Sequence, residues 1–324
     1  MASRLSIGID ISKAHIDITE LPGRKHRQIE RTEAAIDEWL ASLSLGDDTL
    51  VVLEASGGYE RLVLRRLTAA GAPVVLIEPA RARAYARAVK RRAKTDKIDS
   101  GTLADMAEGP ARDERPWKPL GVDAAELRTL VDRRLQLVEM LEAERKRRTT
   151  ARAEDYRAVM SSLEQTMALL KAQVEQVTEQ IAASMAKSHD LCDRAAILIS
   201  VKGVGQTTAA TLLAHVPELG NVDRGQIAAL VGVAPITRES GDWAGKRFIS
   251  GGRAVARKAL YMATLAATRF NDTIRKHYAD LRARGKESKV ALVACMRKLL
   301  IYLNGLLRAD SPARTSSTAS LAET

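Results

Sequence analysis

The N-terminal part of the chain constrains the fold most, because short strand-like runs alternate there with helix-like patterns. Three strand candidates come first, at residues 5–10, 14–20 and 26–31. Apolar residues at helical spacing follow over residues 33–44. The run LVVLE at residues 50–54 is continuously apolar before its final acid, which is typical of a buried central strand. These patterns predict a mixed sheet flanked by helices.

Two glycines, Gly57 and Gly58, open a further predicted helix that runs to residue 70, and a fifth strand is predicted at residues 72–77, before Pro79. Three strands, a helix, a strand, a helix, a strand and more helix is the element order of a ribonuclease H-like sheet. We therefore predict an α/β domain of this kind at residues 1–115. Fold class follows from this order, but function must be argued from individual residues.

Four acidic residues fall at the ends of these predicted elements. Asp10 closes the first strand and Glu54 the fourth, and these two strands are parallel neighbours in such a sheet. Asp96 and Asp99, in the segment KTDKIDSGTLAD at residues 94–105, would lie on one face of a helix. Carboxylates held this close repel one another and suit Mg²⁺ or Mn²⁺, and a pair of such ions can promote phosphoryl transfer.

Each acid also has a plainer interpretation. Asp10 can be a polar strand end, and Glu54 can be a helix-capping acid before Gly57. An Asp-rich segment such as residues 96–99 also suits the positive end of a helix dipole. The four acids together, in this order of elements, favour the metal site.

The charge balance of the chain indicates a polyanionic partner. Lys and Arg number 51 and Asp and Glu number 40, so the formal net charge is 51 − 40 = +11. Residues 81–92 carry several basic side chains and no acid. Aromatic residues make up only 3% of the chain, which favours contacts to phosphate backbones over stacking on bases.

The cysteines and the apolar runs restrict the cellular setting. Cys192 and Cys295 are far apart and have no His at ligand spacing, so neither a disulfide framework nor a zinc site is predicted. We expect no apolar run of the roughly 20 residues that a membrane span needs, and no secretory signal at the N-terminus. These features predict a soluble protein in a reducing cytoplasm.

Residues 123–188 change to long helical patterns whose apolar residues are spaced alternately by four and three, as in a coiled coil. The second of two predicted helices has its seam at Tyr156, Met160, Leu163, Met167, Leu170, Val174, Val177 and Ile181. The first has Leu127, Val131, Val138 and Leu141, and Arg134 interrupts its register. The two helices can form an antiparallel hairpin or seal a subunit interface. We favour the interface, and expect a homodimer or homotetramer.

The C-terminal part begins with two apolar helical patterns at residues 195–220, joined by the turn Lys202-Gly203-Val204-Gly205. This arrangement resembles a helix-hairpin-helix, in which glycines let backbone N–H groups approach a phosphate. A plain turn between two helices is the alternative. A basic tract follows, with Lys246, Arg247, Arg253, Arg257 and Lys258. Residues 309–324 are rich in Ser, Thr and Ala and are predicted to be disordered.

Three short motifs resemble a known family. GID at residues 8–10, LEASGGY at 53–59 and KTDKID at 94–99 are similar to the DEDD signature of the insertion-sequence-110 family of transposases. The N-terminal domain of that family resembles the Holliday-junction resolvase RuvC. The resemblance assigns the four acids of the signature to Asp10, Glu54, Asp96 and Asp99.

The C-terminal part resembles the transposase domain of the same family. ESG at residues 239–241, GKRFISGGR at 245–253 and ARKALYMATLAATR at 256–269 carry this similarity. The resemblance makes Ser240 the expected nucleophile, although composition alone would read it as a turn serine. Residues 246–270 and MRKLL at 296–300 look closest to the subgroup named for insertion sequence 1111.

The resemblance implies a transposase or site-specific recombinase that cuts and rejoins DNA with Mg²⁺ or Mn²⁺ and Ser240. It also implies guidance by a structured non-coding RNA, the bridge RNA of the element, that pairs with donor and target DNA in the bacterial cytoplasm. The side chains and backbone positions that we expect to contact nucleic acid are Arg87, Arg91, Arg92, Lys94, Lys202, Gly203, Gly205, Lys246, Arg247 and Arg253.

Three alternatives stay open from the sequence. The first is a metal-dependent junction nuclease that uses water, with Ser240 structural. The second is a scaffold that binds nucleic acid without catalysis, and the third, a sugar-kinase-like ATPase, lacks a second glycine-rich phosphate loop. The expected organisation is a catalytic domain at 1–115, a helical arm at 123–188, a transposase domain at 195–308 and a tail at 309–324.

Overall fold

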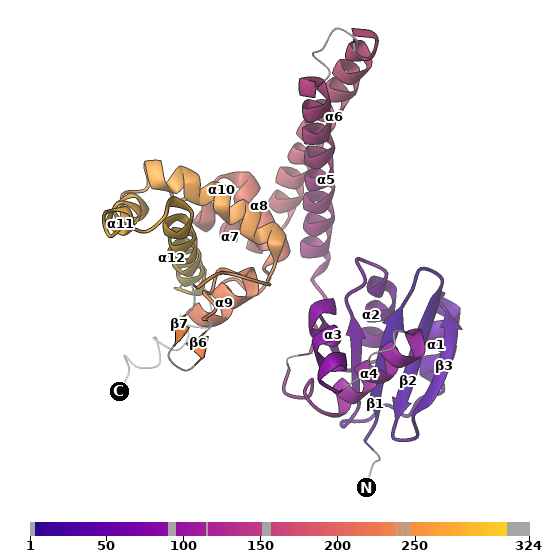
Figure 1. Cartoon of the computed structure of the whole chain (residues 1–324). Helices are drawn as coiled ribbons and strands as arrows, with labels where there is room; N and C mark the ends of the chain where they lie inside the picture. The colour runs from indigo at the N-terminus through magenta and orange to yellow at the C-terminus, as the bar shows by residue number, and fades with distance from the viewer. Residues whose placement is uncertain are drawn as a thin grey trace, which may run out of the picture. The chain divides into compact units, whose positions relative to one another are not determined.

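The computed structural model of the chain forms two compact units, Met1–Pro119 and Leu120–Thr324 (Figure 1). The residues that it describes are 4–89, 95–114, 116–150, 157–237, 239–240, 243–244 and 247–309. For residues 157, 239, 240, 243 and 244 it describes the backbone alone.

The first unit is built on a five-stranded sheet in the order β3-β2-β1-β4-β5. Its strands are β1 (Ser6–Ile11), β2 (His15–Leu21), β3 (Lys25–Glu30), β4 (Leu50–Glu54) and β5 (Val74–Ile77). β1 pairs antiparallel with β2, and β2 with β3, whereas β1 and β4 are parallel, as are β4 and β5. This mixed sheet confirms the predicted α/β class and fits a ribonuclease H-like fold.

Helices cover both faces of this sheet (Figure 1). The alternation along β1 sends Ile7, Ile9 and Ile11 to one face, where they pack with α1 (Glu33–Ala41) and α2 (Glu60–Ala69). The other face packs against α3 (Pro79–Ala88) and α4 (Asp96–Glu108), and it carries Leu50, Val52, Val75 and Ile77. Both faces of the central strands are therefore buried, as their continuous apolar sequence indicates.

Gly8 lets α4 lie directly on the middle of the sheet. A Cβ atom at Gly8 would lie 2.1 Å from the backbone N of Ala104 and 2.1 Å from the backbone O of Ser100. Beside this contact, the hydroxyls of Thr19 and Ser100 form a buried hydrogen bond of 2.9 Å. No residue with a side chain fits at position 8 without moving the helix, so the glycine fixes the distance between α4 and β1.

The second unit begins with two long helices, α5 (Val122–Thr150) and α6 (Arg157–Lys187), which pack along each other (Figure 1). Met167, Leu170, Val177 and Ile181 of the predicted α6 seam are buried. A hairpin within one chain is thus present, which is the alternative that we did not favour. Coiled-coil packing and a subunit interface on this arm stay predictions.

In the described part of the second unit, six further helices form the body around one apolar core that continues into the base of the arm. They are α7 (His189–Ile199), α8 (Gln206–His215), α9 (Arg224–Val231), α10 (Ala254–Phe270), α11 (Asp272–Ala283) and α12 (Ser288–Ala309). Arm and body thus fall in one compact unit, and the predicted boundary between residues 188 and 195 stays a prediction. The predicted tail lies outside the described residues from residue 310 onward.

Helix α12 corrects one sequence expectation. The helix has 22 residues, and an 18-residue window within it has a mean hydropathy of 1.7, so it is long and apolar enough to cross a membrane. Half of this apolar window is buried within the fold, where Met296, Leu299 and Leu303 contribute to the core. Its hydrophobicity is therefore that of a core helix, and no membrane protein is indicated.

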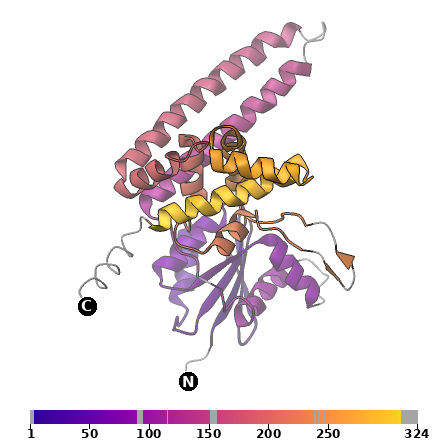
Figure 2. The ribbon, with the colours of Figure 1, turned by 90° about the vertical axis from the view of Figure 1, so that its left-hand side faces the viewer.

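Two short strands, β6 (Glu239–Ser240) and β7 (Trp243–Ala244), pair antiparallel between α9 and α10. Closer to the helices, Ile236 and Phe248 form an isolated antiparallel bridge. Figure 2 shows the strand pair at the end of a long loop that extends away from the helices of its unit.

Candidate active site

The sheet register brings two of the predicted acids together. Ile9 of β1 pairs with Leu53 of β4, so the next residues along the two parallel strands, Asp10 and Glu54, lie side by side. Both follow the alternation that sends Gly8 and Val52 to the face covered by α4. The prediction that parallel strand ends would bring these carboxylates close together is consistent with this register.

Helix α4 carries the other two acids in its first turn. Thr95 is the N-cap, and its hydroxyl accepts a hydrogen bond of 3.3 Å from the backbone N of Ile98. Asp96 and Asp99 follow within the first turn. Because Gly8 holds the next turn of α4 against β1, the start of the helix lies near the end of that strand.

The electrostatics of Asp10 connect all four acids. Its pKa is raised from 3.8 to about 6, first by burial and next by the negative charge of Asp99, with Glu54 and Asp96 adding smaller increases. The backbone N–H of Ile11, which donates to Oδ1 of Asp10 at 3.0 Å, opposes the rise. A carboxyl crowded by three others is the place where a cation would be bound most favourably.

The donor set fits a hard divalent ion in chemistry, since it consists of carboxylate oxygens. Within the described part of the chain, however, no three Asp, Glu, His or Cys side chains converge closely enough to hold a metal ion. The four acids are thus neighbours without a closed coordination shell. The metal site at Asp10, Glu54, Asp96 and Asp99 stays a prediction.

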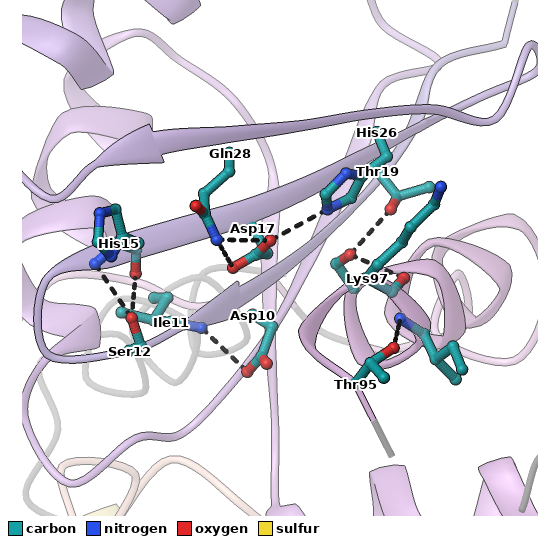
Figure 3. Close-up of polar contacts among 12 residues, drawn as sticks. Asp10, Ile11, Ser12, His15, Asp17, Thr19, His26, Gln28, Thr95 and Lys97 are labelled. Atoms are coloured by element: carbon teal, nitrogen blue, oxygen red, sulfur yellow. Dashed lines mark hydrogen bonds and ion pairs between the residues drawn. The ribbon is translucent and has the colours of Figure 1, made fainter. Parts of the chain in front are cut away.

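A fifth carboxylate, which the sequence reasoning missed, lies next to Asp10 on the neighbouring strand of the sheet. Asp17 of β2 pairs with Asp10 and is only 3% exposed. Its oxygens accept hydrogen bonds from Nε2 of His26 at 3.1 Å and from Nε2 of Gln28 at 3.0 and 3.2 Å (Figure 3). These donors offset the free energy of burying the carboxylate. The alternating sequence AHIDITE places this acid on the face of Thr19, which was the available signal.

The loop after Glu54 is organised by a second residue that was missed, Glu60. Its Oε2 atom accepts from the backbone N of Ser56 at 3.1 Å, the hydroxyl of Ser56 at 2.9 Å and the backbone N of Gly58 at 2.8 Å. Burial alone would raise the pKa of Glu60, but these hydrogen bonds and one from its own N–H lower it. Gly57 and Gly58 have positive φ angles of 71° and 119°, so the predicted helix begins only at Glu60.

Ser240 lies in the second unit, whereas the four acids lie in the first. It is the last residue of β6, where its backbone pairs with Trp243. Its side chain is outside the described atoms, so the nucleophile prediction rests on the resemblance.

The base of the loop that carries Ser240 is fixed by close glycine contacts. A Cβ atom at Gly232 would lie 2.2 Å from the carbonyl O of Gly251, and one at Gly252 would lie 2.3 Å from the backbone N of Gly232. Nη1 of Arg257 donates to the carbonyl O of Val231 at 3.2 Å and to that of Gly251 at 2.5 Å. Residues 251–253, the GGR that ends the motif GKRFISGGR, therefore join the end of α9 to the start of α10.

The predicted nucleic-acid contacts differ in their surroundings. Arg87, Lys202 and Arg247 are exposed, and Gly205 is the N-cap of α8, with open space where a side chain would be. Arg91, Arg92, Lys94 and Lys246 lie outside the described residues. All of these contacts stay predictions.

Two of these predicted contacts also have structural roles. Nη2 of Arg253 donates to Oε1 of Glu218 at 2.6 Å, and its Nη1 donates to the carbonyl O of His215 at 3.0 Å. Gly203 has a φ of 103°, and a Cβ atom there would lie 2.7 Å from the Cβ of Ala267 in α10. This packing requires a glycine at position 203 whether or not a phosphate approaches the turn.

Comparisons with known proteins match both halves of the chain. Residues 7–157 match the model of DEDD transposases of the IS110 type, and residues 195–279 match the model described as the transposase IS116/IS110/IS902 family. The first range includes the four acids, and the second includes Ser240.

Relatives extend the match to nearly the full length. The chain is 25% identical over 321 residues to the pilin gene-inverting proteins of Moraxella bovis and Moraxella lacunata, which covers 96% of this chain and 98% of each relative. It is 30% identical over 152 residues to the insertion element IS110 uncharacterized 43.6 kDa protein of Streptomyces coelicolor, which covers 46% of this chain and 36% of that protein.

Proposed function

Because this chain belongs to the IS110 family of transposases and is therefore a DNA-recombining enzyme, we propose that it cuts and rejoins DNA with a divalent ion and a serine nucleophile. The observation that carries the metal part is the convergence of the ends of β1 and β4 with the start of α4 at Asp10. There, three neighbouring acids and burial raise the pKa of the Asp10 carboxyl to about 6.

Asp10, Glu54, Asp96 and Asp99 are the residues that would hold the ion, which we expect to be Mg²⁺ or Mn²⁺. When bound, such an ion stabilises the negative charge that develops on a phosphate during displacement. Hydrogen bonds and packing around the acids then keep them oriented: Ile11 holds Asp10, and Glu60 holds the loop after Glu54. Thr95 caps the helix that carries the other two.

Ser240 is the proposed nucleophile. Its hydroxyl oxygen would form a bond to a backbone phosphorus of DNA and lose its proton, while the bond from that phosphorus to a deoxyribose oxygen breaks and the leaving oxygen takes up a proton. The linkage conserves one phosphodiester bond, so attack by a second DNA hydroxyl would restore the serine and join the strands. The glycine contacts at Gly232 and Gly252 hold together the two ends of the loop that carries this residue.

The partners follow from the same proposal. DNA is the substrate of the family, and the guide RNA that we expect would bind through phosphate contacts, for which the net charge of +11 is suited. Exposed apolar residues on the arm, with Met140 at 50% and Leu169 at 60% exposure, support contact with a second copy of the chain. The Moraxella relatives are named for inverting a pilin gene, which supports site-specific rearrangement of DNA as the reaction class.

The test is a recombination assay on DNA junction substrates with the RNA of the element, with and without Mg²⁺. Asp10→Asn should reduce strand cutting at least about a hundredfold. Asp47→Asn removes the same charge from an exposed position of the same unit and should leave cutting unchanged. Recombination by Asp10→Asn at the wild-type rate would support the non-catalytic scaffold instead.

Ser240→Ala separates the serine mechanism from the water-using nuclease. The serine mechanism predicts that this variant loses both strand exchange and DNA covalently linked to protein, which denaturing gels detect. A variant that still cuts DNA would show that the serine is structural and that water is the nucleophile.

A further inference from the structure

Arg134 occupies a position in the apolar seam of the arm. Its guanidinium Nε donates to the hydroxyl of Thr178 on α6 at 2.8 Å, and that hydroxyl donates to the carbonyl O of Val174 at 2.6 Å. The side chain is half-buried. A Leu or Met at this position would continue the seam without removing a charge from water.

Within the part of the chain that the structure describes, no acidic neighbour offsets the burial of the Arg134 charge. Among the described residues, no carboxylate lies within ion-pair distance of it, and burial alone lowers the pKa of its guanidinium. The nearest acid along the chain, Asp132, lies with Oδ1 3.0 Å from Nε2 of His215. A half-buried guanidinium in this state would gain free energy from an anion.

A pocket lies beside this guanidinium and is lined by residues of α5, α6 and α8. Arg134, Gln206 and Thr207 supply potential donors to its lining, and Val131, Ile181 and Met185 supply apolar walls. Gln206 and Thr207 are exposed in the first turn of α8, which no side chain caps. The positive end of the helix and the apolar walls both strengthen attraction for an anion.

We propose that this pocket binds one phosphate of a nucleic-acid backbone, with Arg134 as its main ligand and Gln206 and Thr207 as further donors. The inference rests on the proposed function, because it takes the phosphate from DNA bound by the second unit. A phosphate offers several acceptor oxygens to one guanidinium, which a single apolar or amide ligand does not. The site would extend the predicted phosphate binding at the turn before Gly205 onto the helical arm.

The experiment measures how the affinity of the full chain for fluorescently labelled duplex DNA depends on salt concentration. Each phosphate that a protein neutralises contributes about 0.9 to the slope of log affinity against log salt. Arg134→Met should reduce the magnitude of this slope by about one and weaken binding at low salt. The matched control is Arg133→Met, because Arg133 is adjacent, exposed and carries the same charge.

The unfolding temperatures of the variants show whether a change in DNA binding comes from the lost charge or from lost folding. Arg134→Met should unfold at the wild-type temperature or above, because an apolar side chain replaces a desolvated charge. If Arg134→Met is unstable, Arg134→Gln removes the charge, can still donate to Thr178, and gives the same reading of the slope. A slope equal to that of the wild type, or a reduction of the same size in Arg133→Met, would overturn the proposal.

Inorganic phosphate distinguishes the source of the anion. If it raises the unfolding temperature of the wild type but Arg134→Met leaves the DNA slope unchanged, the pocket binds free phosphate and the nucleic-acid proposal is wrong. If phosphate competes with DNA for the wild type but not for Arg134→Met, the nucleic-acid proposal is supported. Because the wild type would still recombine DNA in either case, failure here is separate from failure of the proposed function.

Discussion

The four acids and Ser240 are held by two different kinds of local structure. In the first unit, strand pairing and the contact of α4 with Gly8 fix the main chain within one or two residues of Asp10, Glu54 and Asp99. Asp96 lies one helical turn before this contact. In the second unit, Ser240 is part of a two-residue strand whose loop is fixed at its base by Gly232 and Gly252. The acids are thus placed by the core of their unit, and the serine by the anchoring of a loop.

The largest effect is expected from Gly8→Val, which breaks the placement of the acids. A side chain at this position would meet the backbone of α4 at 2.1 Å, so the helix must move or the unit must unfold. We expect a loss of roughly 3 kcal/mol or more in the free energy of unfolding, together with loss of DNA cutting. Urea denaturation of the full chain measures it.

The control for this prediction is Gly46→Ala, where an added Cβ atom meets nothing within 4 Å. It should change the free energy of unfolding by no more than about 0.5 kcal/mol. Equal stability of the two variants would mean that α4 does not depend on Gly8.

Gly252→Ala tests the loop base in the same way. The new Cβ atom would lie 2.3 Å from the backbone N of Gly232, and the φ of 67° is unfavourable for any other residue. We expect a loss of about 2–3 kcal/mol. Gly251→Ala has the same φ of 67° but open space around its Cβ, so it should lose only about 1–2 kcal/mol. Equal losses would show that conformational strain, and not close packing, sets the requirement.

Asp10→Asn should stabilise the first unit when no metal is present. The pKa of Asp10 in the folded state, about 6, lies above its ordinary value of 3.8, so the folded state binds this proton more tightly than the unfolded state. Its negative charge therefore destabilises the fold at neutral pH, by about 1–2 kcal/mol after allowance for partial exposure. With a chelator present, urea denaturation should show the variant to be more stable at pH 7.

The same stabilisation should vanish on acidification. As pH falls from above 6 to below about 4, Asp10 becomes protonated in both states and Asn loses its advantage. Mg²⁺ should also narrow the difference, by stabilising the wild type alone. A constant advantage at all pH values would indicate that packing, and not charge, is responsible.

The smallest effect is expected from Glu218→Gln, which tests an ion pair near the loop base. Burial raises the pKa of Glu218, but its bonds to Arg253 lower it overall, so this group stabilises the fold above its ordinary pKa. Both side chains are about a third exposed, and we expect a loss of roughly 1 kcal/mol at pH 7. The loss should disappear as pH falls through the lowered pKa, which urea denaturation at several pH values measures.

The sequence predicts the first unit better than the second for physical reasons. Strand β4 has the predicted bounds, because a short apolar run that ends in an acid has few other conformations in a core. Asp17 and Glu60 were missed because their roles depend on partners that share no motif with them, such as His26 on the next strand. Pattern alone does not show which polar residue will be buried against which donor.

The second unit shows where periodicity is insufficient. The predicted seam of α5 included Val138, but Leu137 is the more deeply buried, at 1% exposure. Helix α5 packs against α8 as well as α6, so it buries more than one face. The packing of Gly203 against Ala267 could not be predicted either, because residues 64 positions apart carry no local signal of their contact.

Helix α4 packs so closely on the sheet that there is little room for it to move. The helix meets β1 and β2 through Ser100, whose hydroxyl bonds to that of Thr19, and through the backbone at Ala104, which lies against Gly8. Both residues have short side chains. Long side chains can change rotamer to absorb a displacement, whereas an interface of small groups behaves as a rigid spacer. One methyl group added at this interface would therefore shift Asp96 and Asp99 of α4 relative to Asp10 and Glu54 of the sheet. The small size of the residues between helix and sheet thus sets the geometry of the four acids.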